Sequence, residues 1–340
     1  MDRHRRRGLR AALLALALVA GSLAVITPGA TAAPARAAAV ADTGAKVVEE
    51  KWISERMLDL RIESPALGFV APVRLLLPKG WAPNPSRTWP SFYLLHGCCG
   101  IPEPGHEDHE AWTFKTDVEE LTANTDALVI MPSDGRAGMY TAWWNYGMSS
   151  KPDWETFHLT EVRQILERGY GAGTTRSVAG LSIGGYGAIA YAYRHPGMFK
   201  FAASYSGVLH TLIPVVTQLV QGILLREGLD FYRMWGNEWM QRNIWMSRNP
   251  YDNAEKLRGT QLYISSGNGN AGPLDPPGGA LDFIEPGTQM SSRALTDRLK
   301  QLGIPVTTNF YGNGTHTWPY WQRELHNSYP MIVKSLGLSR

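Results

Sequence analysis

The chain has 340 residues, of which 44% are hydrophobic and 19% are charged, and its formal net charge is +3. Residues 1–37 hold six arginines and one aspartate, a surplus of five positive charges, so the chain after them has a net charge near −2. This balance excludes the strongly basic surface that nucleic-acid binding needs. The remaining length suits one large domain with a substantial core.

The first residues have the order of segments found in a secretory signal peptide. An arginine-rich start precedes an apolar run over residues 11–26 and the small-residue site Ala30-Thr31-Ala32. We therefore expect a cleaved leader over residues 1–37 and a secreted protein, extracellular or associated with the cell wall. A membrane anchor is the alternative. No later run reaches the roughly 20 apolar residues of a membrane-spanning helix, so we expect no further span.

Strand-like and helix-like runs alternate along the rest of the chain. The runs that predict strands are residues 47–64, 71–77, 91–95, 127–132, the stretch from 177 to the glycine at 180, 201–207, 261–267 and 305–310. The runs that predict helices are residues 112–124, 154–169, 187–193, 290–302 and 319–336. This alternation predicts a doubly wound, mostly parallel sheet in a single α/β domain over residues 45–340.

A helical insertion at about 211–247 interrupts this alternation. Val216, Val220 and Leu224 recur at helical spacing, and tryptophans that include Trp235 follow them. Two interpretations stay open: an extra core helix, or a cap that lines a tunnel for a lipid chain. Under the second, Trp235 is a candidate substrate-binding residue.

Ser182 lies in the motif that carries the predicted chemistry. Gly180-Leu181-Ser182-Ile183-Gly184 follows an apolar strand and precedes a small-residue helix. This order predicts a nucleophile elbow of an α/β-hydrolase, in which the serine sits at a sharp strand-to-helix turn between glycines. The Ile183 backbone N–H at the helix N-terminus would then face an oxyanion.

The glycine-rich segment His96-Gly97-Cys98-Cys99-Gly100 follows another buried strand. An α/β-hydrolase places its second oxyanion donor at this strand end, and the Cys98 backbone N–H is our candidate. For His96 we favour a structural role in bracing the loop over a catalytic one. Cys98 and Cys99 are the only cysteines in the chain. Being adjacent, they form no disulfide framework, and a vicinal disulfide, free thiols or a bond to another molecule all remain open.

Two loops carry further candidate residues. Residues 105–110 gather histidines and acids, but in a polar loop without a helical frame, so we predict a solvated loop, no metal site and no cofactor. Residues 134–145 are rich in glycine and aromatics at the sheet edge where open α/β folds bind ligands, which makes Trp143 a candidate substrate-binding residue.

His316 is the only histidine in the loop after the last predicted strand, where an α/β-hydrolase carries its catalytic base. His326 lies in the helix that follows. The acid belongs to the loop after the preceding strand, where Asp275, Asp282 and Glu285 all qualify.

These motifs together resemble the antigen 85 (mycolyltransferase) branch of the esterase superfamily, from about Val73 to the C-terminus. The matching stretches are Gly180-Leu181-Ser182, Met234-Trp235-Gly236, Arg248-Asn249-Pro250, Ser266-Gly267-Asn268-Gly269 and the run from Asn313 to Trp321. The last run is the most specific, because the family carries Asn-Gly-Thr-His-Ser-Trp-x-Tyr-Trp there.

The resemblance implies several site residues. It implies Glu285 as the acid, with Asp282 in reserve, Cys98 as the second oxyanion donor, and Trp318 as a substrate contact. The family's Asp and Arg that bind trehalose are His96 and Cys99 here, so specific use of trehalose is not implied.

The resulting hypothesis is a secreted serine acyl-transfer enzyme with the triad Ser182, His316 and Glu285. It would form an acyl-serine from a lipid or other acyl ester, and pass the acyl group to a carbohydrate hydroxyl or to water. A plain carboxylesterase acting on aryl, polysaccharide or polyester substrates is the close alternative, and a non-catalytic binding or adhesion protein is a third. We expect a monomer that needs neither a metal nor nucleic acid.

Overall fold

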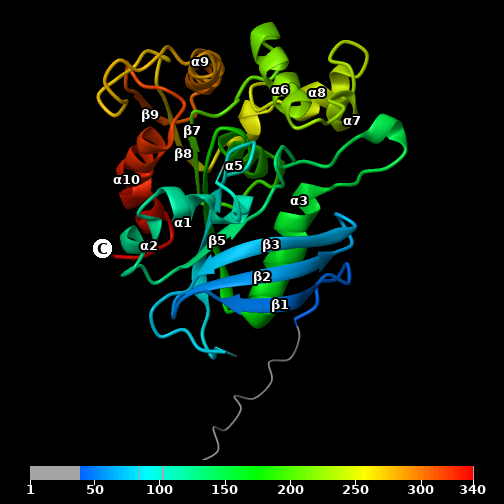
Figure 1. Cartoon of the computed structure of the whole chain (residues 1–340), viewed down its shortest axis with the longest axis vertical. Helices are drawn as coiled ribbons and strands as arrows, with labels where there is room; N and C mark the ends of the chain where they lie inside the picture. Colours follow the sequence, from blue (N-terminus) through cyan, green and yellow to red (C-terminus); the bar gives the residue numbers. More distant parts are fainter. Residues whose placement is uncertain (1–38, 84, 102, 340) are drawn as a thin grey trace, which may run out of the picture. The chain divides into compact units, whose positions relative to one another are not determined.

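A nine-stranded sheet runs through the described part of the chain (Figure 1). The computed structural model describes residues 39–83, 85–101 and 103–339, so the predicted signal peptide lies outside the described residues. The strands are β1 (Lys46–Trp52), β2 (Met57–Ser64), β3 (Phe69–Leu76), β4 (Trp89–Leu95), β5 (Leu128–Pro132), β6 (Ala172–Leu181), β7 (Phe201–Tyr205), β8 (Gln261–Ser266) and β9 (Thr307–Phe310).

The sheet is mostly parallel, as predicted. Its strand order is β1-β2-β3-β5-β4-β6-β7-β8-β9. The pairs β1–β2, β2–β3 and β3–β5 are antiparallel, and every pair from β5 to β9 is parallel. Parallel strands end at the same edge of the sheet, so the loops after β4, β6, β7, β8 and β9 are brought together there.

Helices connect the strands and cover both faces of the sheet. They are α1 (Ala111–Lys115), α2 (Val118–Leu121), α3 (Trp154–Thr156), the π-helical η3 (Phe157–Val162), α4 (Arg163–Gly169), α5 (Ile183–Arg194), α6 (Pro214–Arg226), α7 (Tyr232–Trp235), α8 (Arg242–Ser247), α9 (Glu285–Gln301) and α10 (Trp318–Ser335). Short 3-10 turns are η1 (Asp108–Glu110), η2 (Asn145–Gly147) and η4 (Ala254–Leu257).

The central strands are buried on both faces. In β4, Phe92 and Leu94 join a core with α1, α2 and α10, whereas Tyr93 and Leu95 join a core with α4, α5, α6 and α9. Successive side chains of a strand point to opposite faces, so a continuous apolar run supplies both cores at once.

Three helices differ from the prediction. Helix α5 begins at Ile183, directly after the serine, rather than at residue 187. The helix expected over 112–124 is two short helices, because Thr116 is extended, with φ −141° and ψ 171°. Helix α9 begins at Glu285 rather than at Met290, because the Asp282 carboxylate accepts the N–H groups of Ile284 and Glu285 at 2.7 and 2.8 Å and so caps the first turn.

The predicted insertion carries α6, α7 and α8. The apolar stripe of α6, with Val216, Val220 and Leu224, is buried in the same core as α9, against which α6 packs. The insertion thus supplies buried core side chains, in line with the first of its two interpretations.

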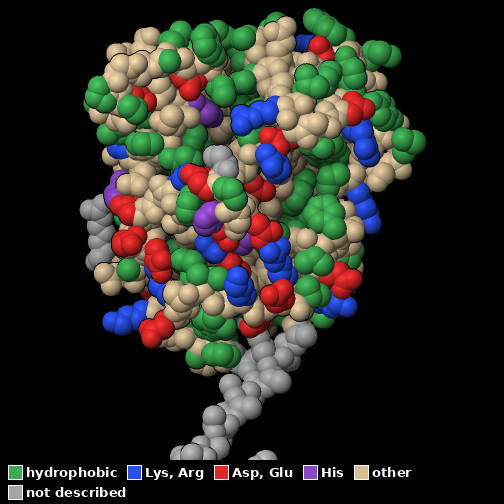
Figure 2. Space-filling view, viewed as in Figure 1, with side chains coloured by type: hydrophobic (Ala, Val, Ile, Leu, Met, Phe, Trp, Pro, Cys, Tyr) green, Lys and Arg blue, Asp and Glu red, His purple; other side chains and the backbone are tan. Residues whose placement is uncertain are grey.

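Charged side chains of both signs lie on the surface of the described chain. On the face shown in Figure 2, Lys and Arg side chains are intermixed with Asp and Glu. Among the described residues, none of the helices has the length and apolar character needed to cross a membrane.

Candidate active site

Ser182 stands at a tight turn between β6 and α5. Its backbone has φ 52° and ψ −121°, a conformation that residues other than glycine seldom adopt. Gly180 and Gly184 make this turn possible. A Cβ on Gly180 would overlap the carbonyl of Gly184, and a Cβ on Gly184 would overlap the carbonyl of His96. The turn is the strand–serine–helix elbow that the motif predicts.

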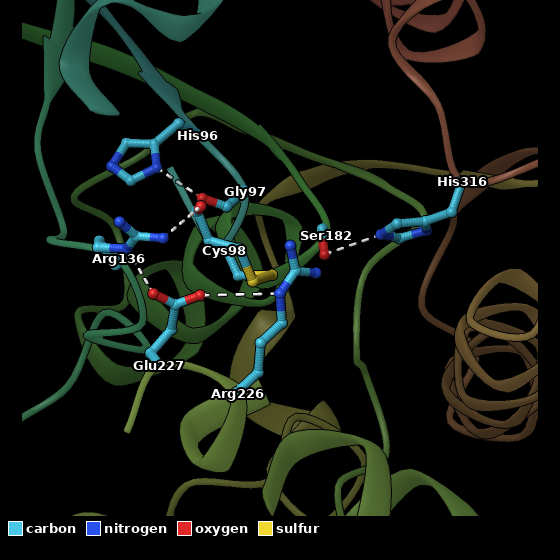
Figure 3. Close-up of a disulfide and its surroundings, with 9 residues drawn as sticks. His96, Gly97, Cys98, Arg136, Ser182, Arg226, Glu227 and His316 are labelled. Atoms are coloured by element: carbon cyan, nitrogen blue, oxygen red, sulfur yellow. Dashed lines mark hydrogen bonds and ion pairs between the residues drawn. A yellow bond between two sulfur atoms is a disulfide. The ribbon is translucent and has the colours of Figure 1, made fainter. Parts of the chain in front are cut away.

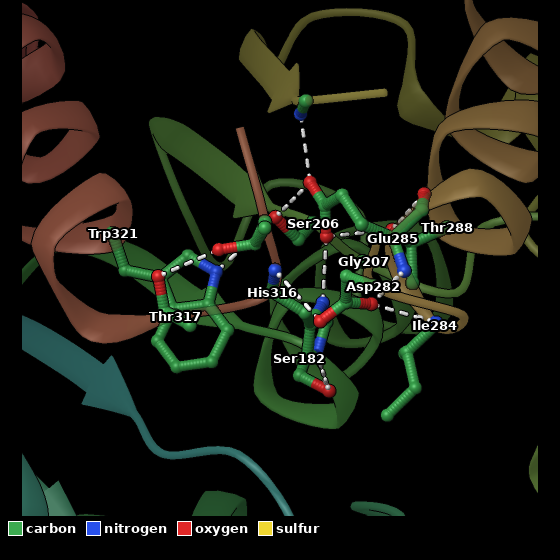
Figure 4. A network of polar contacts seen from close by, with 12 residues as sticks. Ser182, Ser206, Gly207, Asp282, Ile284, Glu285, Thr288, His316, Thr317 and Trp321 are labelled. Carbon is green, nitrogen blue, oxygen red and sulfur yellow. Dashed lines mark hydrogen bonds and ion pairs between the residues drawn. The ribbon is translucent and has the colours of Figure 1, made fainter. Parts of the chain in front are cut away.

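His316 reaches Ser182 from the loop between β9 and α10. Its Nε2 lies 2.9 Å from the Ser182 Oγ, and its Nδ1 lies 2.6 Å from a carboxylate oxygen of Glu285 (Figure 4). The ring of Trp321 meets the imidazole edge to face, with centroids 4.9 Å apart. Serine, imidazole and carboxylate therefore form one hydrogen-bonded series.

Glu285 is fully buried and receives hydrogen bonds from several groups besides His316. The Ser206 hydroxyl donates to it at 2.8 Å, the Gly267 N–H at 2.7 Å, and the Thr288 hydroxyl lies 3.1 Å away. A buried carboxylate needs such donors to replace water. Its position corrects the expectation of a loop residue, because Glu285 is the first residue of α9.

The other two candidate acids lie nearby in different roles. Asp282 caps α9 and also accepts the backbone N–H of His316 at 3.2 Å. Asp275 accepts hydrogen bonds from the Tyr320 hydroxyl at 2.7 Å and from Thr315. Burial alone would raise the pKa of Asp275, but the hydrogen bonds that it accepts from Thr315, the Gly272 N–H and Tyr320 lower it overall. Neither carboxylate is bonded to the His316 ring.

The backbone N–H of Cys98 has no hydrogen-bond acceptor within the described part of the chain. The N–H of Ile183 opens α5, where the first turn of a helix leaves its donors free. Ile183 follows Ser182 in the chain. Cys98 follows Gly97, which packs against the elbow: a Cβ on Gly97 would lie 2.5 Å from the Leu181 side chain and 3.4 Å from the Ser182 Cβ. The structure thus leaves both predicted donors free beside the serine.

Cys98 and Cys99 are joined in a vicinal disulfide beside Ser182 (Figure 3). His96 lies on the other side of the same loop and is buried. Its Nδ1 is 2.7 Å from the Gly97 carbonyl, and its Nε2 accepts the Asp134 N–H at 2.9 Å. Burial lowers the pKa of His96, which keeps the ring neutral and able to accept that bond. These contacts brace the loop, as the sequence suggested.

A cavity of about 100 Å³ opens at Ser182 and His316. The loop over residues 96–100 forms one wall, and Trp318 and Trp321 form another. Trp318 also packs edge to face on Trp112, with centroids 5.4 Å apart. The Asp108 side chain lines the cavity too, although the sequence assigned its segment to solvent.

Trp143 and Trp235 do not line this cavity, and the complete burial of Trp235 corrects its assignment as a substrate contact. Trp235 is completely buried, and its ring packs against Trp245 and Tyr186 in the core rather than over the active-site cavity. Trp143 lines a separate cavity of about 320 Å³ together with Trp154.

The histidine-rich loop is less solvated than predicted. His109 is 2% exposed and, with Asp59 and Glu110, forms a group of side chains whose size would suit a metal ion. Arg74 enters this group, with guanidinium nitrogens 2.7 and 2.8 Å from Asp59 and 3.3 Å from Glu110. A permanent cation already balances these carboxylates, so the donor set does not fit a metal.

Sequence reasoning missed three residues of the site: Ser206, Trp321 and Asp108. Ser206 donates to Glu285 and accepts the Trp321 indole N–H at 3.1 Å. The available signals were the end of the β7 strand for Ser206 and the specific run from Asn313 for Trp321. Asp108 gave none, because its loop folds back onto the cavity only in three dimensions.

Strand order, elbow and loop arrangement define the class of protein as an α/β-hydrolase. The family described as "Putative esterase" matches residues 64–332. The chain is 29% identical over 260 residues to the diacylglycerol acyltransferase/mycolyltransferase Ag85B of Mycobacterium intracellulare, covering 74% of this chain and 76% of that protein. It is 28% identical to Esterase Rv1288 of Mycobacterium tuberculosis, covering 77% of this chain and 56% of that protein.

Among solved structures, the chain resembles Mycobacterium tuberculosis MPT51 (FbpC1) with a TM-score of 0.67 and 25% identity, over 80% of this chain and 96% of that one. The Staphylococcus aureus serine hydrolase FphF shares the fold, with a TM-score of 0.61 and 20% identity over 82% of this chain and 98% of that one. The chain therefore belongs to the esterase family, in its antigen 85-like branch, and is an esterase or acyltransferase of that family.

Proposed function

We propose that the protein is a secreted serine acyl-transfer enzyme that forms an acyl-Ser182 intermediate and passes the acyl group to a sugar hydroxyl or to water. The observation that carries this proposal is the series of hydrogen bonds Glu285–His316–Ser182 at the floor of a cavity. Catalytic serines act through this combination of nucleophile, base and orienting acid.

The proton positions follow from the acceptors. Because the Glu285 carboxylate accepts at Nδ1 of His316, that nitrogen carries the proton, and Nε2 is free to take the Ser182 hydroxyl proton. Ser182 Oγ then bonds to the ester carbonyl carbon, and the carbonyl oxygen becomes an oxyanion. The N–H groups of Ile183 and Cys98 would hold this oxyanion.

Release of the alcohol and release of the acyl group each pass a proton through Nε2 of His316. The imidazolium of His316 returns it to the leaving alcohol as the carbon–oxygen bond breaks, which leaves the acyl-serine. An acceptor hydroxyl then gives its proton to Nε2 and attacks the acyl carbon, and His316 protonates Ser182 as the acyl group leaves. The acceptor decides between transfer and hydrolysis.

The position of the Asp108 side chain favours an acceptor molecule that carries hydroxyl groups. Its carboxylate oxygen and the Arg136 guanidinium flank Gly100, at 3.1 and 3.8 Å from the place a Cβ would occupy there. An acid and an arginine from other loops thus stand next to the segment where the family's Asp and Arg are missing. Asp108 lines the cavity at Ser182, and its carboxylate suits the hydrogen bonds of a sugar, whereas Arg136 is bonded to Glu227 and to the Cys99 carbonyl.

The size of the cavity bears on the acyl donor. An engineered protein cavity of roughly 150 Å³ holds one benzene, whereas the cavity at Ser182 has about 100 Å³. We infer that it encloses a short acyl group or the reactive end of a longer one. A plain carboxylesterase is the second candidate function, because Ser182, His316 and Glu285 catalyse the same steps when water is the acceptor.

Product analysis tests the proposal. The chain without residues 1–37 is given a short-chain acyl ester with and without excess trehalose or glucose, and the products are identified by mass spectrometry. Acylated sugar supports transfer, and free acid alone supports the esterase.

Ser182→Ala provides the decisive variant. We expect turnover to fall by at least about 10⁴-fold while the fold is retained, because no other group replaces the nucleophile. Activity near that of the wild type would refute the assignment of Ser182 and return the binding protein to consideration.

A further inference from the structure

We propose that His96 and the Cys98–Cys99 disulfide together hold the Cys98 N–H in position as an oxyanion donor. This inference rests on the proposed function, since it concerns one step of that reaction. Both groups act through the backbone, so they are positioning residues rather than catalytic ones. Neither belongs to the series Glu285–His316–Ser182, which leaves their effect separable from loss of the nucleophile.

His96 controls the peptide unit that contains the donor. The Gly97 carbonyl and the Cys98 N–H belong to one trans peptide, so they point in opposite directions. Because the Asp134 N–H donates to Nε2 of His96, the ring proton is on Nδ1, which donates to the Gly97 carbonyl at 2.7 Å. This bond, drawn in Figure 3, fixes the carbonyl towards His96. The Cys98 N–H of the same trans peptide therefore points away from His96.

The disulfide controls the next peptide unit. It closes a small covalent ring that includes the peptide bond between Cys98 and Cys99. Cys99 has φ 74°, a region that L-residues other than glycine rarely occupy, and the ring restricts its rotation away from it. Arg136 holds Cys99 from outside the ring: its carbonyl accepts the Cys99 N–H at 2.6 Å, and its side chain donates to the Cys99 carbonyl at 3.2 Å.

The Cys98 Cα therefore lies between two peptide units that are both held from outside. Gly97 packs directly against Leu181 and Ser182, so a small shift of this loop changes the direction of the donor relative to the serine. Hydrogen bonds weaken steeply as their angle departs from linearity, and an oxyanion donor acts only when it is already aligned.

Chemical reduction of the wild-type protein is the first test. Dithiothreitol supplies two electrons and two protons, the S–S bond breaks, two thiols form, and dithiothreitol becomes a cyclic disulfide. We expect kcat for a short acyl ester to fall by about 10-fold, with KM little changed, because a misaligned donor costs less than the roughly 100- to 1000-fold of a donor that is lost altogether. Because the chain has only two cysteines, no other disulfide can respond. Cys98→Ser/Cys99→Ser is the matched control and should not respond to the reductant.

A pair of His96 variants tests the other contact without a redox step. His96→Ala removes the donor to the Gly97 carbonyl, whereas His96→Asn places an amide N–H close to the position of Nδ1. Both lose the acceptor for Asp134. We expect His96→Ala to lower kcat with KM unchanged and His96→Asn to recover most of it. Affinity for a small alkylboronic acid, which forms a tetrahedral adduct on the serine hydroxyl, should fall in parallel with kcat.

The outcomes separate the two proposals. Turnover that depends on Ser182 in the oxidised protein, with the losses just described, supports the inference. The same turnover with kcat and boronic acid affinity unchanged within twofold on reduction and in His96→Ala would overturn the inference alone. Absence of turnover dependent on Ser182 in the oxidised protein would overturn both.

Discussion

Glu285 shows how a single buried charge depends on its neighbours. The carboxylate is removed from water, and every contact described for it comes from a donor: His316, Ser206, the Gly267 N–H and Thr288. A negative charge in this place favours the Nδ1–H tautomer of His316 and stabilises the imidazolium that forms during attack. The charge, rather than the shape of the side chain, is what the site requires.

We predict that Glu285→Gln lowers kcat by about 10³- to 10⁴-fold, because the amide has nearly the same shape but cannot select the tautomer. Steady-state kinetics on a short acyl ester measures this loss. Asp275→Asn is the matched control, a carboxylate-to-amide change that does not touch the His316 ring, and should lose less than about tenfold. A comparable loss in both variants would contradict the assignment of Glu285.

At the scale of elements, the start of α9 decides where Glu285 lies. Asp282 accepts the N–H groups of Ile284 and Glu285, and its second oxygen accepts the His316 N–H. One side chain therefore joins the first turn of α9 to the loop that carries His316 (Figure 4). The helix is an active part of the site, because its first residue is the acid.

Asp282→Ala should lower the free energy of unfolding by about 1 kcal/mol, as expected for loss of an N-cap, and should also lower kcat because Glu285 and His316 are no longer held together. Urea unfolding and kinetics measure the two effects. Asp297→Ala lies on the exposed face of the same helix, with a side chain 69% exposed, and should change stability by less than about 0.5 kcal/mol. Equal stability of the two variants would refute the capping role.

At the scale of the whole molecule, the double-sided core buries ionisable groups that must stay neutral. His158 on η3 is completely buried, with Nδ1 2.7 Å from the Tyr191 hydroxyl and Nε2 2.8 Å from the Ser133 carbonyl. Burial lowers the pKa of His158 to about 3 and also lowers the pKa of His96. Below the ordinary histidine pKa, both rings stay neutral in the folded protein, whereas the same side chains are protonated in the unfolded chain.

We predict that the protein loses stability as the pH falls below about 6.5, the ordinary histidine pKa. Between that pH and the lower folded pKa, the unfolded state binds protons that the folded state does not, so each buried histidine costs up to about 1.4 kcal/mol per pH unit. Urea unfolding at pH 7.5 and 5.5 measures the loss. It should be about 1 kcal/mol smaller in His158→Gln. An equal loss in the wild-type protein and in His158→Gln would contradict this origin.

The sequence by itself determined the strand alternation, the elbow at Ser182 and the choice of His316, because each depends on local pattern: apolar runs, glycines beside a serine, and one histidine in the loop after the last strand. It also predicted the mostly parallel sheet and the branch of the family. These features depend on short segments and on their order in the chain, so contacts between distant segments do not alter them.

The tertiary structure decided what depends on distance between segments. Spacing left Asp275, Asp282 and Glu285 equivalent, although the family resemblance implied Glu285, and the folded chain brings the Glu285 carboxylate rather than those of its neighbours to the His316 ring. Trp235 went into the core and Asp108 into the cavity because burial is settled by what packs opposite a side chain. The sequence also left open whether Cys98 and Cys99 are bonded to each other and what the His96 ring contacts. The folded loop beside Ser182 shows the disulfide and the contact of His96 with the Gly97 carbonyl. A sequence pattern specifies which face a residue takes, but its neighbours across that face come from elsewhere in the chain.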